Sequence, residues 1–407
     1  MNVLHINQSD IGGGAAIAGY RLHEGLLAQG MNSRLLVGEV KTSSDRVAPV
    51  PSSKRRIENQ LYRFAWRFGL NYINLLGSFD IPKLSFYQEA DVLNFHNLHT
   101  GYFNYLAIPS LTETKPAVFT LHDVWSFTGH CAYSYDCDRW KIGCGKCPYP
   151  DTYPGIGRDS TRWEWKLKNS VYSRSNLTIV TPSGWLTEQA KQSMLNHFPI
   201  HHIPYGIDTE AYQPLDCEQC RLLLGIPISK KVLMFGAANI TDSRKGGDLL
   251  LKALQSLPES LKADILLVTI GDGGEVISES VGIPNLNLGY VSSDRLKSIA
   301  YSAADLFIFP TRADNLPLVL QESMACGTPM VSFKIGGVSD LVRPGVTGYL
   351  ANPEDAEDLS NGIVQLLEDP QQRDRMSQNC RAIALKEYPL ELQAKRYIQL
   401  YHQILQT

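Results

Sequence analysis

Short, wholly apolar segments recur along the chain and alternate with longer stretches of helical periodicity. In the first half these segments are VLHI from Val3, AVFTL from Ala117 and LTIVT from Leu177. In the second half they are VLMFGA from Val232, DILLVTIG from Asp264, DLFIFP from Asp305 and PMVSF from Pro329. Strands that are apolar throughout and separated by helices are typical of parallel sheets covered on both faces. The pattern therefore predicts an α/β fold with two Rossmann-like units in series.

The expected boundary between the two units lies in the segment HHIPYGID, residues 201–208. A chain of 407 residues is longer than one hydrophobic core usually supports, which also favours two domains. We place them at 1–205 and 206–385. The last segment, 386–407, has the period of an amphipathic helix and is expected to pack back on the first domain. Its apolar side carries Leu392, Tyr397, Leu400, Tyr401 and Ile404. Because parallel sheets bind ligands beyond the carboxyl ends of their strands, we expect the site in a cleft that the two domains share.

Composition narrows the class of protein. A hydrophobic share of 43% and a charged share of 19% are ordinary for a globular protein, and a net charge of −3 lacks the basic excess of nucleic-acid binders. The chain has no run of about 18 apolar residues, and MNVLHINQSD at its start resembles a strand and turn rather than a secretion signal. We therefore predict a cytoplasmic location and eight cysteines that remain thiols.

The segment 309–332 (FPTRADNLPLVLQESMACGTPMVS) sets two carboxylates, Asp314 and Glu322, eight positions apart. The segment follows an apolar strand. A helical pattern then begins at Leu318 and ends at Gly327. A helix N-terminus can hold an anion, while carboxylates can accept hydrogen bonds from hydroxyls. The arrangement suits a ligand with a phosphate and sugar hydroxyls. The alternative is a capped helix on which Glu322 is a solvated surface charge.

Two glycine-containing turns open helices directly after predicted strands. Residues 12–14 are three glycines, which would let a ligand approach the backbone closely, although a tight structural turn would show the same pattern. Arg244 and Lys245 precede two further glycines at the start of the helix DLLLKAL. Two cations at a helix start suit a diphosphate, and a solvated basic turn is the alternative.

Histidines follow one predicted strand and one further apolar run in the first domain. His122 ends the strand AVFTL, where it could hydrogen-bond a sugar hydroxyl or handle a proton with a pKa near physiological pH. A lone histidine at a strand end is more often structural. His96 and His99 follow the run DVLNF and are weaker candidates for the same cleft.

Four cysteines gather in one loop-like region: Cys131, Cys137, Cys144 and Cys147. One C-x2-C pair with two further cysteines nearby makes them a candidate structural zinc site. Their irregular spacing leaves ordinary thiols as the alternative. We expect no metal in catalysis.

The segment 54–72 reads as a basic amphipathic helix. Arg56, Arg63 and Arg67 share one side. The other side carries Leu61, Phe64, Ala65, Phe68 and Tyr72. Such a helix can lie on an anionic membrane surface, and an ordinary surface helix is the alternative.

Nearly the whole chain resembles the GT-B nucleotide-sugar glycosyltransferases, in particular the retaining group called glycosyltransferase family 4. The matching segments are PYGID, FGA, RKGGDLLLKAL, TIGDGGE, LGYVS, AADLFIFPTRADNLPLVLQESMACGTPMVS and GGVSDLVRPGVTGYL, in that order. The motifs HDVWSFTGHC and CGKCP resemble those of bacterial exopolysaccharide enzymes, among them cyanobacterial heterocyst-envelope polysaccharide glycosyltransferases.

The resemblance implies an acceptor-binding first domain, completed by the helix 386–407, and a donor-binding second domain. It implies the following roles: Arg244 and Lys245 for the donor diphosphate, Glu322 for the ribose, Asp314, Asn315 and Leu316 for the donor sugar, Val291 for the base, His122 for the sugar, and Gly13 and Gly14 near the phosphates and acceptor.

Two departures from the family pattern stand out. Asp314 takes the place of a family glutamate and is shorter by one carbon–carbon bond, about 1.5 Å. The arginine that commonly precedes the Lys-Gly pair is absent near Asn239, and Arg244 is its candidate replacement.

The resulting expectation is a metal-independent, retaining hexosyltransferase that needs no cofactor. Its favoured donor is UDP-glucose, ahead of GDP-mannose and UDP-galactose, and its acceptor is a growing polysaccharide, with lipid-linked glycans as one candidate. By resemblance, substitution is front-side and the departing phosphate takes the acceptor proton. The alternatives are a catalytically silent nucleotide-sugar-binding regulator and a GT-B sugar-nucleotide epimerase. A phosphorylase would need a lysine for pyridoxal phosphate, which no motif suggests.

Overall fold

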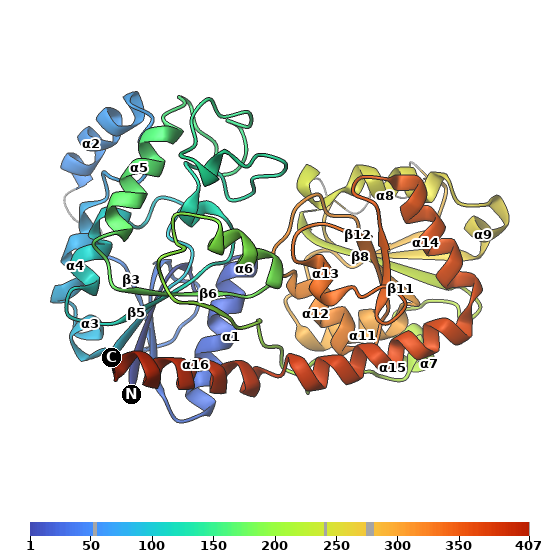
Figure 1. Cartoon of the computed structure of the whole chain (residues 1–407). Coiled ribbons are helices and arrows are strands. Elements are labelled where there is room, and N and C mark those ends of the chain that lie inside the picture. The colour runs from blue at the N-terminus through green and yellow to red at the C-terminus, as the bar shows by residue number, and fades with distance from the viewer. Residues whose placement is uncertain (52–54, 240–241, 274–280, 407) are drawn as a thin grey trace. The chain divides into compact units, whose positions relative to one another are not determined.

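The chain divides into two compact units in the computed structural model, which describes residues 1–51, 55–239, 242–273 and 281–406. Unit 1 contains Met1–Gly206 and Glu391–Thr407, and unit 2 contains Ile207–Leu390. Each unit has one parallel sheet with helices around it (Figure 1). The predicted α/β class with two Rossmann-like units is confirmed.

Unit 1 is built on a seven-stranded sheet with the order β3-β2-β1-β4-β5-β6-β7. The strands are β1 (Asn2–Ser9), β2 (Asn32–Glu39), β3 (Val47–Pro49), β4 (Val92–Phe95), β5 (Ala117–Thr120), β6 (Leu177–Thr181) and β7 (Ile200–His202). The helices are α1 (Gly14–Ala28), α2 (Arg55–Arg67), α3 (Ser85–Glu89), α4 (Ile108–Thr112), α5 (Thr161–Tyr172), α6 (Gly184–Lys191) and α16 (Leu390–Leu405). Short 3-10 turns are η1 (Leu76–Lys83), η2 (Tyr105–Ala107), η3 (Trp125–Phe127) and η4 (Arg139–Lys141).

Unit 2 is built on a six-stranded sheet with the order β10-β9-β8-β11-β12-β13. The strands are β8 (Lys231–Asn239), β9 (Ile265–Asp272), β10 (Asn285–Asn287), β11 (Leu306–Phe309), β12 (Met330–Phe333) and β13 (Gly348–Ala351). The helices are α7 (Cys217–Leu223), α8 (Gly247–Gln255), α9 (Glu259–Asp264), α11 (Asp294–Ala303), α12 (Leu318–Ala325), α13 (Val338–Leu341), α14 (Ala356–Glu368) and α15 (Pro370–Glu387), with the 3-10 turn η5 (Ser243–Lys245).

The strand order reverses at the same point in both units. In unit 1 the first strand, β1, pairs with β2 on one side and β4 on the other; in unit 2, β8 pairs likewise with β9 and β11. Loops that leave the two strands at such a switch point run in opposite directions and leave a crevice at the carboxyl edge of the sheet. The loops after β1, β4, β8 and β11 are therefore the ones in position to bind a ligand.

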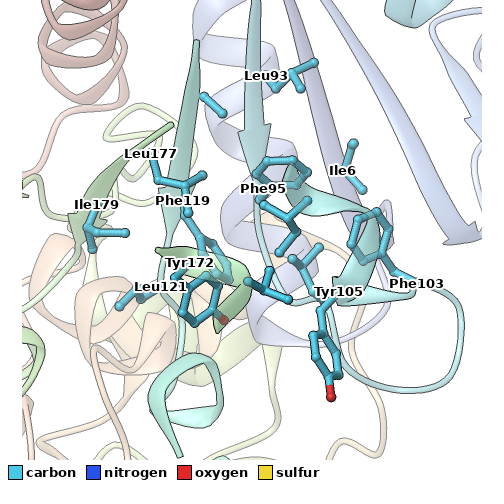
Figure 2. Packing of buried hydrophobic residues seen from close by; sticks show 14 of the residues in the cluster. Ile6, Leu93, Phe95, Phe103, Tyr105, Phe119, Leu121, Tyr172, Leu177 and Ile179 are labelled. Carbon is cyan, nitrogen blue, oxygen red and sulfur yellow. The ribbon is translucent and has the colours of Figure 1, made fainter. Parts of the chain in front are cut away.

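Central strands are buried along their whole length, which explains their continuous apolar sequence. Every residue of β4, β5, β6, β11 and β12 is buried. Figure 2 shows one face of the unit 1 sheet, where side chains of adjacent strands pack with residues from flanking segments. The labelled residues are Ile6, Leu93, Phe95, Phe103, Tyr105, Phe119, Leu121, Tyr172, Leu177 and Ile179. This packing fixes the strand ends from which the candidate site residues emerge.

Helix α16 packs on unit 1, as the sequence predicts. Its Ala394, Tyr397, Leu400 and Tyr401 join a buried cluster with residues of β1, β4, β5 and β6. Asn94 Nδ2 donates to the Tyr401 hydroxyl at 2.8 Å, and Thr120 Oγ1 lies 3.0 Å from the Tyr397 hydroxyl. The helix thus supplies hydroxyl partners for buried polar groups of the sheet. Within the residues that the structure describes, no helix has the length and apolar character needed to cross a membrane.

Candidate functional site

Two loops at the switch point of unit 2 bring Arg244, Lys245 and Asp314 together. The cations lie in η5 after β8, and Asp314 lies in the loop after β11. Lys245 Nζ donates to Asp314 Oδ2 at 2.6 Å, and Arg244 Nη1 donates to the same oxygen at 3.2 Å. Arg244 Nη1 also donates to the carbonyl of Ala313 at 3.0 Å. Arg244, Lys245 and Asp314, all predicted as site residues, therefore form one cluster.

Electrostatics in this cluster favour the ionised carboxylate. Burial by itself raises the pKa of Asp314, but the adjacent Lys245 and Arg244 outweigh it and hold the pKa below its ordinary value. Burial lowers the pKa of Lys245, and the Asp314 carboxylate opposes that shift. In this structure Asp314 is thus the anion that accepts hydrogen bonds from both cations. The resemblance assigns these cations to the donor diphosphate instead.

Gly246 allows the two loops to approach each other. Its φ of 72° is left-handed, and a Cβ at this position would lie 1.8 Å from the carbonyl oxygen of Pro310. Only glycine combines this backbone conformation with so close a contact. The close approach of the loop after β11 therefore requires glycine at position 246, between Lys245 and helix α8.

The remaining predicted donor residues of unit 2 lie at the same edge of the sheet. Asn315 and Leu316 are buried just before α12, whose N-terminal turn has no side-chain cap. Glu322, on α12, is only 4% exposed, so it is not a solvated surface charge. The Tyr301 hydroxyl donates to Glu322 Oε2 at 3.5 Å. Val291 is buried in the loop that follows β10. The ligand roles of these residues stay predictions.

In unit 1 the glycine turn lies at the start of α1, beside the switch point. Gly13 has a φ of 91° and caps the helix without a side-chain hydrogen bond. Apart from the adjoining backbone, no atom of the described residues lies within 4 Å of the position that a Cβ would take at Gly13 or Gly14. The turn is therefore open enough for a ligand to approach, and its phosphate or acceptor role stays a prediction.

His122 is part of a buried stack of rings rather than a lone histidine. His5 Nδ1 lies 2.9 Å from His96 Nε2, and His96 Nδ1 lies 2.9 Å from His122 Nε2. His122 Nδ1 lies 2.6 Å from the hydroxyl of Tyr205. The rings stack along this chain. Because both nitrogens of His122 have partners, a sugar hydroxyl would have to displace one of them.

The expected near-neutral pKa of His122 is wrong. Burial lowers the pKa of His122 to about 4, against a smaller opposing effect of Asp123. Burial also lowers the pKa of His5 to about 3 and that of His96 well below its ordinary value. The stack is neutral at physiological pH because the interior of unit 1 disfavours the charged imidazole.

His99 and Asp123 form a buried pair at the carboxyl ends of the adjacent strands β4 and β5. His99 Nε2 lies 2.9 Å from Asp123 Oδ2, and their side chains are 2% and 9% exposed. The backbone N–H of Trp125 donates to Asp123 Oδ1 at 2.9 Å. Sequence reasoning gave His99 little weight and assigned no role to Asp123. Their positions after neighbouring parallel strands were the signal that could have joined them.

The four cysteines 131, 137, 144 and 147 line one small cavity of unit 1, together with His130. His130 Nε2 lies 3.2 Å from Cys147 Sγ, and the Gly129 N–H donates to Cys144 Sγ at 3.2 Å. All four thiols are free, and burial raises the pKa of Cys144 to about 11. Across the described ranges, no three His, Cys, Asp or Glu side chains are placed to hold a metal ion. Zinc stays a prediction that metal analysis of purified protein would decide.

Helix α2 and the residue that follows it expose large apolar side chains. Leu61, Phe64 and Phe68 are exposed, and the rings of Phe64 and Phe68 lie 4.7 Å apart. Ala65, which the sequence pattern groups with them, is buried instead. Glu58 Oε1 accepts the Leu76 N–H at 3.0 Å and ties the helix to unit 1. The aromatic stripe is thus left on the surface.

Comparison with known proteins finds similarity to glycosyltransferases over most of the chain. The family model "Glycosyl transferases group 1" matches residues 227–383, and "Glycosyltransferase Family 4" matches residues 12–211. The chain is 28% identical over 356 residues to WcaC of Escherichia coli K12, named as a colanic acid biosynthesis glycosyl transferase, with 82% of this chain and 83% of WcaC covered.

Two solved structures share the fold over nearly the whole chain. Sucrose-phosphate synthase of Thermosynechococcus elongatus superposes with a TM-score of 0.72 at 17% identity, and 99% of each chain is covered. HepE of Anabaena, solved in complex with UDP-glucose, superposes with a TM-score of 0.69 at 16% identity, covering 99% of this chain and 100% of HepE.

The fold has the GT-B architecture, and a glycosyltransferase model matches most of each of its two units. The matching models are those of group 1 and of family 4, and the chain has a similar protein in polysaccharide biosynthesis.

Proposed function

We propose that this glycosyltransferase moves a hexose from a nucleoside diphosphate sugar to a growing polysaccharide, with retention of anomeric configuration. UDP-glucose is the favoured donor. The observation that carries the proposal is the meeting of Arg244, Lys245 and Asp314 at the switch point of unit 2. WcaC, named for colanic acid biosynthesis, and the UDP-glucose complex of HepE support the acceptor class and the donor.

The donor diphosphate replaces Asp314 as the anion beside Arg244 and Lys245. As the bond between the sugar C1 and the diphosphate oxygen breaks, these cations stabilise the charge that develops on the leaving group. Asp314, displaced from the cations, becomes available to the sugar hydroxyls together with Asn315. Glu322 holds the ribose and Val291 places the base. Substitution from the front face gives the retained configuration.

A thermal-shift panel of nucleotide sugars tests the donor. A ligand that binds only the folded chain raises its melting temperature, so UDP-glucose should stabilise the wild type. Lys245→Met and Glu322→Ala should each abolish the shift, whereas Lys252→Met, at an exposed position of helix α8, should keep it. A shift with GDP-mannose and none with any UDP-sugar would refute the UDP donor. An unchanged shift in Glu322→Ala would refute its ribose role.

Product analysis separates transfer from the competing functions. The proposed enzyme releases UDP from UDP-glucose and extends a glycan, and proton NMR of the new linkage should show the anomeric configuration of the donor. Inversion would refute retention. Tight donor binding without UDP release or extension, over several acceptors, would indicate a regulator, and conversion of the donor to another UDP-sugar would indicate an epimerase.

We infer that α2 holds the enzyme on an anionic lipid surface at the cytoplasmic side of a membrane. The exposed stripe of Leu61, Phe64 and Phe68 would enter the interface while Arg63 and Arg67, also exposed, meet lipid phosphates. In vesicle co-sedimentation, anionic vesicles should retain the protein and zwitterionic ones should not. The double variant Phe64→Ser, Phe68→Ser should lose binding. Trp163→Ser, which removes an equally exposed aromatic of unit 1, is the control, and equal binding by all three proteins would refute the role of α2.

A further inference from the structure

Arg312 joins three segments at the carboxyl edge of the unit 2 sheet. It lies in the loop after β11, two positions before Asp314. Its Nη1 and Nη2 donate to the two carboxylate oxygens of Asp248, in the first turn of α8, at 2.8 and 2.7 Å. Its Nε donates to Glu354 Oε2, in the loop between β13 and α14, at 2.8 Å. The side chain of Arg312 therefore ties the start of α8 to the loops after β11 and β13.

The same residue holds the backbone of η5, the turn that carries the two cations. Arg312 Nη1 donates to the carbonyl oxygen of Ser243 at 2.6 Å, and the backbone N–H of Arg312 donates to the carbonyl oxygen of Arg244 at 2.8 Å. The hydroxyl of Thr311 also donates to the Arg244 carbonyl, at 3.1 Å. The loop after β11 therefore sets the orientation of two successive peptide groups of η5.

The two cationic side chains emerge directly after these peptide groups. The peptide group of Ser243 leads into Arg244, and that of Arg244 leads into Lys245. Rotation of either group would turn the side chain that follows, because the backbone sets the direction in which a side chain leaves it. Gly246, at the end of the turn, is held by its close contact with the loop after β11. Arg312 is therefore in position to determine where the charge of Lys245 lies.

The contact between Arg312 and Asp248 depends on the shape of the guanidinium as well as on its charge. A guanidinium presents its donors in a planar fork that matches a carboxylate, whereas the ammonium of lysine acts as a point charge. The hydrogen bonds from Arg312 hold the pKa of Asp248 below its ordinary value. The carboxylate therefore stays ionised, and the forked pair stays intact, at neutral pH.

We propose that Arg312 is a positioning residue for the donor diphosphate, because it fixes the turn from which Arg244 and Lys245 reach that group. The inference rests on the proposed function, in which these two cations bind the diphosphate. The guanidinium of Arg312 is already paired with two carboxylates, so its contribution runs through the placement of the cations. A turn that is fixed beforehand loses less conformational entropy when the ligand binds.

The test compares two ligands that differ by one phosphate. UDP and UMP share the base and the ribose, so the ratio of their dissociation constants measures the contribution of the second phosphate. Isothermal titration of the wild type should show tighter binding of UDP. In Arg312→Gln this preference for UDP should fall about tenfold, the effect of one charge-assisted hydrogen bond. Arg312→Lys should lose nearly as much, because lysine keeps the charge but lacks the fork.

Arg343→Gln is the matched control. Arg343 donates to the two carboxylate oxygens of Glu387 at 3.0 and 2.6 Å, which makes another forked pair of unit 2, away from η5. Loss of either arginine should lower the melting temperature, but Arg343→Gln should keep the wild-type preference for UDP. If Arg312 had a merely structural role, the two variants would behave alike in both measurements.

Asp248→Asn is a milder second variant. The amide keeps the shape of the carboxylate but not its charge, and Arg312 can still donate to the Ser243 carbonyl. The preference for UDP should therefore fall in Asp248→Asn, but by less than in Arg312→Gln. If Arg312→Gln did not fold, an unchanged preference in Asp248→Asn would by itself overturn the inference.

Two further results would overturn the positioning role. One is a wild-type preference for UDP in Arg312→Gln, and the other is an equal loss of that preference in Arg343→Gln. A wild type that binds UDP no more tightly than UMP would instead remove the diphosphate role of Arg244 and Lys245, and with it the proposed function. The two failures can be told apart, because the first leaves the wild-type preference intact.

Discussion

At the scale of single residues, Asp314 is where this chain departs from the family pattern. Its carboxylate accepts from Lys245 at 2.6 Å and from Arg244 at 3.2 Å. The two cations that we propose for the donor diphosphate are therefore paired with the residue that we propose for the donor sugar. Under the proposed function, the diphosphate of a nucleotide competes with the Asp314 carboxylate for these cations.

Removing that competition should strengthen the binding of UDP. In Asp314→Asn the amide carries no charge, so we expect UDP affinity to rise several-fold, while UDP release from UDP-glucose falls because the sugar contact is lost. Isothermal titration with UDP and a turnover assay measure the two effects. Asp242→Asn is the matched control, because Asp242 is more exposed and lies 3.4 Å from Arg244, and it should change UDP affinity less. Weaker UDP binding in Asp314→Asn would contradict the argument.

Sequence alone could predict Arg244, Lys245 and Asp314, because the two cations follow one apolar strand and Asp314 follows another. It could not predict that Asp314 pairs with the cations, since their loops are about seventy residues apart and meet only through strand order. The partners of His122 were missed for the same reason. His5, His96 and Tyr205 come from three separate segments, and no local pattern joins them.

At the scale of elements, the predicted strands are the ones that carry a continuous apolar run. All seven segments named from the sequence are strands in the structure. Short edge strands such as β3, β7 and β10 were not predicted, because they have three residues each and are only partly buried. A strand at an edge has one neighbour and little need for apolar residues, so its sequence carries a weak signal.

The loop contact at Gly246 gives a prediction for the start of α8. Gly246→Ala should destabilise unit 2 by more than 2 kcal/mol, roughly, because a left-handed backbone costs alanine about 1–2 kcal/mol and the Cβ also collides with Pro310. Gly225→Ala is the matched control: its φ is 68°, but nothing lies within 4 Å of its Cβ position. Thermal unfolding should show the larger loss for Gly246→Ala, and equal losses would mean that the loop contact does not matter.

At the scale of the whole molecule, the two units repeat one strand order but differ in what they bury at the switch point. Unit 2 gathers charges there, whereas unit 1 buries a neutral histidine stack. The apolar runs predicted the repeated sheets. They could not predict this difference, because burial of a polar ring depends on partners that only the folded unit supplies.

Burial of neutral histidines should make the protein sensitive to acid. Burial lowers the pKa of His23 to about 4, with a smaller effect of Arg46, so below an unfolded value near 6.5 the unfolded chain binds a proton that the folded chain does not. The free energy of unfolding should therefore fall as the pH drops from 6.5 to 4. His23→Gln should reduce this fall by about 1 kcal/mol per pH unit near pH 5. Denaturant unfolding at pH 7.5 and 5 measures it.

The exposed His402 provides the control for the acid experiment. His402→Gln should keep the wild-type pH dependence. If His23→Gln also kept it, protonation of His23 would not contribute to acid unfolding.

The split of unit 1 into two stretches of chain has a consequence for its biosynthesis. Residues 391–407 complete the cluster that covers one face of its sheet, yet the whole of unit 2 lies between them and Gly206. Domains usually fold in the order in which they are synthesised. In this chain, however, one apolar face of the unit 1 sheet stays uncovered until unit 2 has been synthesised. The unit that begins first is the one that closes last.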